Sequence, residues 1–209
     1  MHLHDPHAHQ ALPPPIYRQN VLVPGGASTG PLPGAGLRNT KLALGIAQVL
    51  TGTAAVGLVT AGAFVGADGG AMLMAVGGGV LLLCAALLLV WALLSLLWVH
   101  KFWSWLPPEQ RHASLWKRYI SPGEATFFML IPYFGIFWMF VIYLGMADAL
   151  ERMRVEYPTA RPPAKTLALL YVIGPLVFFP AAPLLEYFFC RHVEGMATDM
   201  QARMPRAAA

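Results

Sequence analysis

Four histidines lie close together at the start of the chain and could bind a metal ion. His2, His4, His7 and His9 all fall within the segment 1–10. Paired neutral imidazoles are good ligands for Zn²⁺, Cu²⁺ or Ni²⁺. No second group of ligands lies nearby, and ordering a free tail costs about 1–2 kcal/mol per residue. A polar tail without a metal is therefore the simpler interpretation, and metal handling is the weaker functional hypothesis.

Glu186 is the second candidate for chemistry, because it directly follows the charge-free run 166–185. An ionisable side chain at membrane depth is costly and commonly marks the path of an ion or a proton. The alternative is a carboxylate at the membrane interface, paired with Arg191 or hydrogen-bonded by Tyr187. We keep both interpretations at this point.

The remaining chemical groups point away from catalysis. His100, His112 and His192 stand at or beyond the ends of apolar segments, where a bis-histidine haem does not form. Cys84 and Cys190 lie in apolar surroundings and have no zinc or redox spacing. Metalloprotease, P-loop and nucleophile-elbow motifs are absent from the sequence. The sequence therefore predicts a protein that is not an enzyme and holds no cofactor.

Composition identifies the environment of these residues. Of 209 residues, 57% are hydrophobic and only 11% are charged, with 14 Lys+Arg against 10 Asp+Glu. A soluble domain carries about 25% charged residues. The basic residues form no stripe and accompany no nucleic-acid module, which excludes a nucleic-acid partner. The chain is expected to be an all-α integral membrane protein whose first partner is the lipid bilayer.

Four apolar segments are long enough to be considered as membrane spans. They cover residues 42–67, 71–99, 125–147 and 166–185, and about 20 residues suffice to cross the bilayer. Asp68-Gly69-Gly70 is expected to form the turn of a first helical hairpin. Proline interrupts the last two segments, so these either span the bilayer or re-enter it, turning back near Pro132 and Pro180. Four transmembrane helices are the favoured arrangement.

The segments divide the chain into five regions. A Pro/Gly/His-rich tail (1–40), expected to be disordered or extended, precedes the hairpin (41–99). An interfacial segment (100–120) follows, in which tryptophans alternate with basic residues as they do at headgroup level. Two further membrane segments (121–190) and an amphipathic C-terminal tail (191–209) complete the chain.

Local signals mark the ends of the third segment. Ser121-Pro122-Gly123-Glu124 fits a capping box, in which Ser121 and Glu124 exchange hydrogen bonds at a helix start. At the other end, Asp148 and Arg152 are spaced for an ion pair on one helix face.

Small residues recur four positions apart along the first hairpin and predict close helix packing. The packing candidates are Thr53, Gly57, Ala61, Gly62, Gly66, Ala71, Ala75 and Gly79. Packing of the two hairpin helices against each other and association with other membrane subunits or a second copy explain this pattern equally well.

The basic residues also predict orientation. With both termini cytoplasmic, a four-span arrangement places most of them on the cytoplasmic side, whereas re-entrant segments place all of them there. We expect a multi-pass protein of the bacterial inner membrane.

The segment 121–150 resembles part of a family of uncharacterised bacterial multi-span membrane proteins, grouped as a domain of unknown function. The resemblance rests on Ser121, Pro122, Gly123, Ala125, Ile131, Pro132 and Asp148, and it covers about residues 95–200. The family pattern has asparagine soon after the proline, where this chain has Gly135. The resemblance implies a bacterial multi-span fold and supplies no activity.

Two functions from different classes follow. The leading hypothesis is a non-enzymatic membrane subunit or scaffold of a larger bacterial membrane complex. The alternative is a small oligomeric channel or transporter in which Glu186 is the intramembrane polar group.

Overall fold

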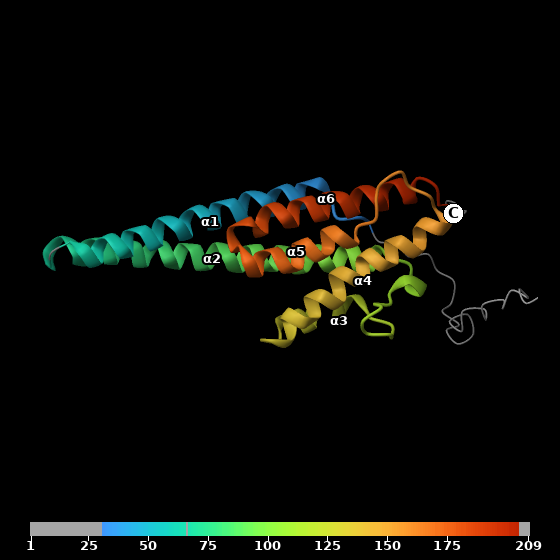
Figure 1. Ribbon diagram of the computed structural model, residues 1–209, viewed down its shortest axis with the longest axis horizontal. Coiled ribbons are helices and arrows are strands. Elements are labelled where there is room, and N and C mark those ends of the chain that lie inside the picture. The colour runs from blue at the N-terminus through green and yellow to red at the C-terminus, as the bar shows by residue number, and fades with distance from the viewer. Residues whose placement is uncertain (1–30, 66, 205–209) are drawn as a thin grey trace, which may run out of the picture.

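The structure is a computed structural model that describes residues 31–65 and 67–204. Every named element in this part of the chain is helical. Five long helices form the architecture, joined by one short α-helix and three single 3₁₀ turns (Figure 1). The elements are α1 (Ala35–Phe64), α2 (Ala67–Trp105), η2 (Pro108–Gln110), α3 (Pro122–Phe127), η3 (Phe128–Leu130), α4 (Phe134–Glu156), α5 (Lys165–Val177), η4 (Phe179–Ala181) and α6 (Ala182–Gln201).

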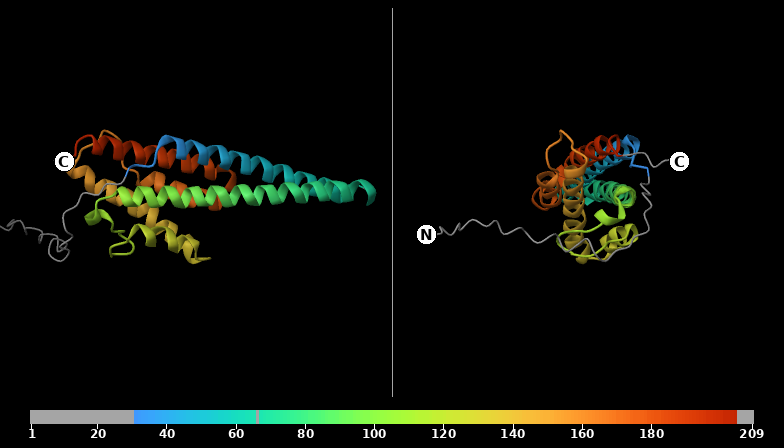
Figure 2. Two further views of the ribbon diagram at one scale, coloured as in Figure 1. Left: turned by 180° about the vertical axis from the view of Figure 1, so that it is seen from behind. Right: turned by 90° about the vertical axis from the view of Figure 1, so that its right-hand side faces the viewer.

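Helices α1 and α2 form the predicted hairpin, and they extend well beyond the other helices (Figures 1 and 2). With 30 and 39 residues, they are about 45 Å and 58 Å long at 1.5 Å per residue. The turn differs from the prediction, because α1 ends at Phe64 and residues 68–70 already belong to α2. Residues 68–70 can be helical because Gly69 and Gly70 have no side chain to collide with the end of α1. Helix α2 therefore begins directly against α1.

Glycine permits the close approach of the hairpin helices near this turn. A Cβ atom on Gly70 would lie 2.5 Å from the carbonyl oxygen of Gly62, and one on Gly62 would lie 3.0 Å from the carbonyl oxygen of Gly70. Farther along, a Cβ atom on Gly77 would lie 2.7 Å from Val59. Backbones in this contact gain van der Waals attraction that lipid cannot replace.

The outer half of the hairpin has an apolar surface that no other part of the described chain covers. In α2, none of the residues in its most apolar stretch is buried, and Leu82 and Met72 are among the most exposed. Three helices, α1, α2 and α4, are long and apolar enough to cross a membrane. Such a surface would aggregate in water, and the chain is a membrane protein.

The segment 100–120, which we predict to be interfacial, is partly buried within the protein. Residues 100–105 continue α2, and the kink comes at Pro107-Pro108 as expected. Trp103 and Trp105 are fully buried in the protein core, and Trp103 donates a 2.8 Å hydrogen bond to the carbonyl of Ile120. The Trp103 ring fills the space between α2, the following loop and α4, while Trp105 packs against Phe102 of its own helix.

The capping box at the start of α3 is confirmed. The Glu124 backbone N–H donates to Ser121 Oγ at 3.2 Å, and the Ser121 backbone N–H donates to Glu124 Oε2 at 2.8 Å. The third predicted segment is not one helix, however. After η3 the chain reverses at residues 131–133, where Tyr133 has a φ of 62°, and α4 then runs in a new direction.

The fourth predicted segment, 166–185, is also divided. Helix α5 ends at Val177, two residues after Pro175, and η4 carries Pro180 into the reversal that starts α6. Proline withdraws hydrogen-bond donors here, so a continuous helix is unfavourable. Helices α5 and α6 pack together as a second hairpin (Figure 1). An arrangement of four spans is not confirmed, and the re-entrant alternative agrees with these reversals.

The charged ends of the helices gather at one end of the molecule. The beginnings of α1 and α5 and the ends of α2, α4 and α6 all lie there, and the α1–α2 turn lies at the other end (Figures 1 and 2). Asp148 pairs with Lys165 across the α4–α5 connection at 3.0 Å, and not with Arg152 as the spacing predicts. Arg152 instead bonds the carbonyls of Gln110 and His112 at 3.0 Å each.

Candidate functional site

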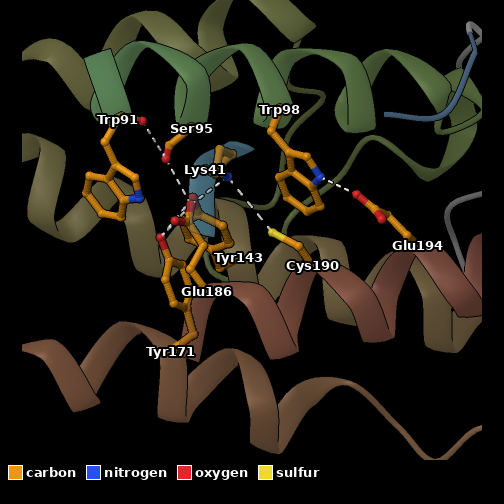
Figure 3. Close-up of polar contacts among 9 residues, drawn as sticks. All are labelled: Lys41, Trp91, Ser95, Trp98, Tyr143, Tyr171, Glu186, Cys190 and Glu194. Carbon is orange, nitrogen blue, oxygen red and sulfur yellow. Dashed lines mark hydrogen bonds and ion pairs between the residues drawn. The ribbon is translucent and has the colours of Figure 1, made fainter. Parts of the chain in front are cut away.

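A cluster of polar side chains is buried where the five long helices meet. The Lys41–Glu186 cluster comprises one or two residues from each helix (Figure 3). Its members are Lys41 of α1, Ser95 of α2, Tyr143 of α4, Tyr171 of α5, and Glu186 and Cys190 of α6. Because all five helices contribute, the cluster depends on the complete bundle.

The carboxylate of Glu186 is the centre of this cluster. Its Oε1 atom lies 2.6 Å from Lys41 Nζ, and both side chains are only 3% exposed. The same oxygen accepts hydrogen bonds from Ser95 Oγ at 2.9 Å and from the Tyr171 hydroxyl at 3.5 Å. A buried charge requires this kind of pairing, because desolvation costs several kcal/mol per ion.

A second ion pair stands beside the first, along the same two helices. Arg38 of α1 pairs with Glu194 of α6, and Trp98 Nε1 donates to the other carboxylate oxygen at 2.7 Å. The face of Trp98 also lies 5.1 Å from Lys41 Nζ. Trp98 thus contacts one group of each pair, and a cation over an indole ring is stabilised electrostatically.

Close packing fixes the positions of these groups. A Cβ atom on Gly45 would lie 2.6 Å from Cβ of Pro183, so glycine is required where α1 crosses the beginning of α6. Tyr143, Tyr171 and Phe189 stack or meet edge to face with centroids 4.7–5.7 Å apart. Aromatic pairs of this geometry contribute about 0.5–1.5 kcal/mol each beyond their buried area.

The chemistry of the cluster is that of compensated charge. Each of the two buried carboxylates, Glu186 and Glu194, is matched by a cation and by at least one neutral donor. The thiol of Cys190 lies 4.0 Å from Lys41 Nζ but is itself buried, so no substrate reaches it in this arrangement. Among residues 31–65 and 67–204, no three His, Cys, Asp or Glu side chains come together to hold a metal ion.

The partner of Glu186 differs from the one that its sequence neighbours suggest. Glu186 is buried and pairs with Lys41, whereas Arg191 is exposed and forms no ion pair within the described part of the chain. The histidines His2, His4, His7 and His9, and also Gly66, lie outside the described residues. Cys84 is a free thiol whose Sγ donates to the carbonyl of Gln48 at 3.5 Å.

The predicted packing residues separate into two groups. Gly62 is buried between α1 and α2. Six others are exposed on the outside of the hairpin: Thr53, Gly57, Ala61, Ala71, Ala75 and Gly79. At Gly57 and Gly79, an added Cβ would meet nothing within 4 Å. The other glycines at contacts between the hairpin helices are Gly52, Gly70 and Gly77, which are outside the predicted set.

Sequence reasoning missed Arg38, Lys41, Ser95 and Trp98 as members of the buried polar region. One available signal was Lys41 itself, a lysine that immediately precedes a long apolar run just as Glu186 immediately follows one. Two opposite charges at comparable boundaries of apolar segments are candidates to pair.

No protein-family model, no curated protein and no solved structure matches this chain. The structure does explain the glycine at position 135. A Cβ atom there would lie 2.4 Å from the carbonyl oxygen of Met129, so a larger side chain such as asparagine does not fit this reversal without a backbone shift.

Proposed function

We propose that this chain is a non-enzymatic integral membrane subunit or scaffold of a larger complex in the bacterial inner membrane. The observation that carries the proposal is the outward orientation of the small residues on the hairpin. Thr53, Gly57 and Ala61 on α1, with Ala75 and Gly79 on α2, are exposed and leave room for another helix. In lipid, faces of this kind allow helices to associate by close backbone contact.

The buried polar residues support a structural role. The two carboxylates of the bundle are neutralised by Lys41 and Arg38, and the helices around them are closely packed. A catalytic carboxylate needs access to substrate and a geometry that changes little on binding. The geometry of Glu186 is fixed because its carboxylate is bound by Lys41, Ser95 and Tyr171, and these contacts also close it to a substrate. We therefore assign Glu186 to holding α1 against α6.

The placement of charge supports a one-sided orientation. Between Lys41 and Lys101 the only charged residue is Asp68, close to the α1–α2 turn. All the basic residues therefore lie outside the apolar part of the hairpin. With the α1–α2 hairpin crossing the bilayer, the charged end faces the cytoplasm, in agreement with the positive-inside tendency. The apolar parts of the chain after Glu124 then penetrate the bilayer from that side, and both termini are cytoplasmic.

Purification of the full chain in mild detergent, followed by identification of co-purifying chains, tests the proposal. Gly57→Leu fills the outward face of α1 and is expected to remove partners or self-association. Val56→Leu changes a neighbouring exposed position and is the matched control, expected to behave as the wild type. A stable lone monomer whose behaviour neither variant changes contradicts the proposal.

The burial of Glu186 among Tyr171, Tyr143 and Ser95 favours one alternative, a small oligomeric channel or transporter. Hydroxyl groups beside an intramembrane carboxylate are suitable for proton or cation transfer. Ion flux in liposomes separates the two functions. If the pair conducts, Glu186→Gln abolishes the flux, and the double variant Lys41→Gln/Glu186→Gln does not restore it. If the Lys41–Glu186 pair is structural, liposomes containing the wild-type protein show no ion flux.

A further inference from the structure

A cavity at the charged end contains three arginines and is a candidate site for an anionic ligand. It has a volume of about 520 Å³ and lies between the start of α1, the α4–α5 connection and the C-terminal half of α6. Arg38, Arg161 and Arg191 line it together with Glu194 and Asp199, and residues 32–35 form a largely apolar wall. Ligand sites of small molecules have volumes of this order, about 300–1,000 Å³.

The carboxylates in the cavity are already occupied by donors. Glu194 accepts from Arg38 and Trp98, and Asp199 accepts from Arg161 Nε and from the Thr159 hydroxyl, both at 3.0 Å. Arg191 has no hydrogen bond or ion pair with the described residues, and the buried Nε of Arg38 has no acceptor. The cavity therefore retains one uncompensated positive charge and free guanidinium donors.

The arrangement of Arg161 depends on a glycine. A Cβ atom on Gly195 would lie 2.5 Å from Arg161 Cζ and 2.8 Å from its Nε and Nη1 atoms. The guanidinium thus rests directly on the backbone of α6, one turn from Arg191. Planar guanidinium groups converging in this way bind phosphate oxygens with paired hydrogen bonds.

The same face of α6 carries exposed apolar side chains next to the cavity. Leu184, Phe188, Arg191 and Gly195 are spaced four, three and four residues apart and share one helix face. Leu184 is 49% and Phe188 is 52% exposed, and both precede Arg191 in α6, a helix whose last turn lies at the charged end (Figure 1). A free phosphate makes no apolar contact with Leu184 and Phe188, whereas the acyl chain of a lipid covers both side chains.

We propose that this cavity binds the headgroup of an anionic phospholipid, with the phosphodiester between Arg191, Arg161 and Arg38. The acyl chains run along Phe188 and Leu184. The single negative charge of a phosphodiester matches the one uncompensated arginine. Basic pockets between membrane helices on the cytoplasmic side are suited to such headgroups.

Titration of the purified full chain with lipid, with bound lipid counted by native mass spectrometry, tests the proposal. Phosphatidylglycerol is expected to bind in preference to phosphatidylcholine, and inorganic phosphate is expected not to displace it. Arg191→Gln should weaken binding of phosphatidylglycerol by about tenfold, the loss of one charge-assisted contact. Because Arg191 is exposed and unpaired, this variant keeps the fold.

Two further variants separate a built site from diffuse charge. Gly195→Ala leaves the net charge unchanged but displaces the Arg161 guanidinium, and it should also weaken binding. Arg154→Gln removes a guanidinium at the same end of the molecule but outside the cavity, and it should leave binding unchanged. Equal binding of the two lipids, displacement by inorganic phosphate, or equal weakening by Arg154→Gln would overturn the proposal.

Discussion

The ammonium group of Lys41 lies 2.6 Å from the carboxylate of Glu186, and both are removed almost completely from solvent. This pair joins the second turn of the first helix to the start of the last helix. It therefore fastens α1 directly to α6, and Ser95 of α2 and Tyr171 of α5 bind the same carboxylate, with Tyr143 of α4 next to Tyr171.

Removal of one member of this pair is expected to destabilise the protein strongly. Glu186→Gln leaves the Lys41 ammonium buried beside Trp98 without a counter-charge, and Lys41→Met leaves the carboxylate. Breaking a buried pair in this way costs about 3–5 kcal/mol. Thermal unfolding in detergent, followed by tryptophan fluorescence, measures the loss.

The double variant Lys41→Met/Glu186→Leu distinguishes the cost of an orphaned charge from the value of the pair itself. It should recover most of the stability that each single variant loses, since no charge then remains buried. Arg154→Gln, which breaks an exposed pair with Glu151, should change stability by less than about 1 kcal/mol. A double variant as unstable as the sum of both singles contradicts this account.

Replacement of a hairpin glycine by alanine is expected to lower or raise the stability of the protein, depending on what surrounds that glycine. Gly70→Ala should destabilise by about 1–3 kcal/mol, because its Cβ would lie 2.5 Å from the Gly62 carbonyl oxygen and the helices must separate. Gly57→Ala, where nothing lies within 4 Å, should stabilise by about 0.5–1 kcal/mol through the better helix propensity of alanine. Unfolding temperatures in the same detergent compare the two, and destabilisation by both variants would mean that Gly57 is also packed.

The start of α3 provides a prediction about a single cap. Ser121→Ala removes the acceptor of the Glu124 N–H and should cost about 1 kcal/mol. Ser104→Ala is the control, since the Ser104 hydroxyl has no hydrogen bond with the described residues. Chemical unfolding of both variants measures the difference, which disappears if solvent replaces the cap without cost.

The same cap predicts a dependence on pH. The hydrogen bond from the Ser121 backbone N–H is the main factor that holds the pKa of Glu124 below its ordinary value of 4.5, with a smaller contribution from Arg118. Because the folded pKa is lowered, the stabilisation is complete above pH 4.5 and is lost as the pH falls through the folded value. The stability difference between the wild type and Glu124→Ala should therefore shrink below about pH 4.5. A difference that stays constant to lower pH contradicts this prediction.

The sequence contained the local features of this fold but not the long-range ones. The capping box was predictable because Ser121 and Glu124 are three residues apart, and the first hairpin because its apolar runs are long. Lys41 could not be matched to Glu186, since a pairing across the whole chain depends on how the helices pack. For the same reason, Asp148 pairs with Lys165 and not with Arg152, which lies on its own helix.

The last prediction concerns the side of the membrane on which each connection lies. Single cysteines at Phe64, Lys117 and Ala160 report on the hairpin turn, the loop after α2 and the α4–α5 connection, and all three positions are exposed. Cys84 and Cys190 are replaced by alanine in every variant, so that an impermeant maleimide reacts only at the chosen site.

With the charged end on one side, the cysteines at 117 and 160 should react from the same face of sealed vesicles, and the cysteine at 64 from the opposite face. Four complete spans would instead place 160 with 64, because α4 would then carry the chain across the bilayer. The one-sided result is expected since the chain reverses at residues 131–133 and again at η4. It also agrees with the positive-inside tendency, because it keeps Arg152, Arg154 and Lys165 on the same side as the other basic residues.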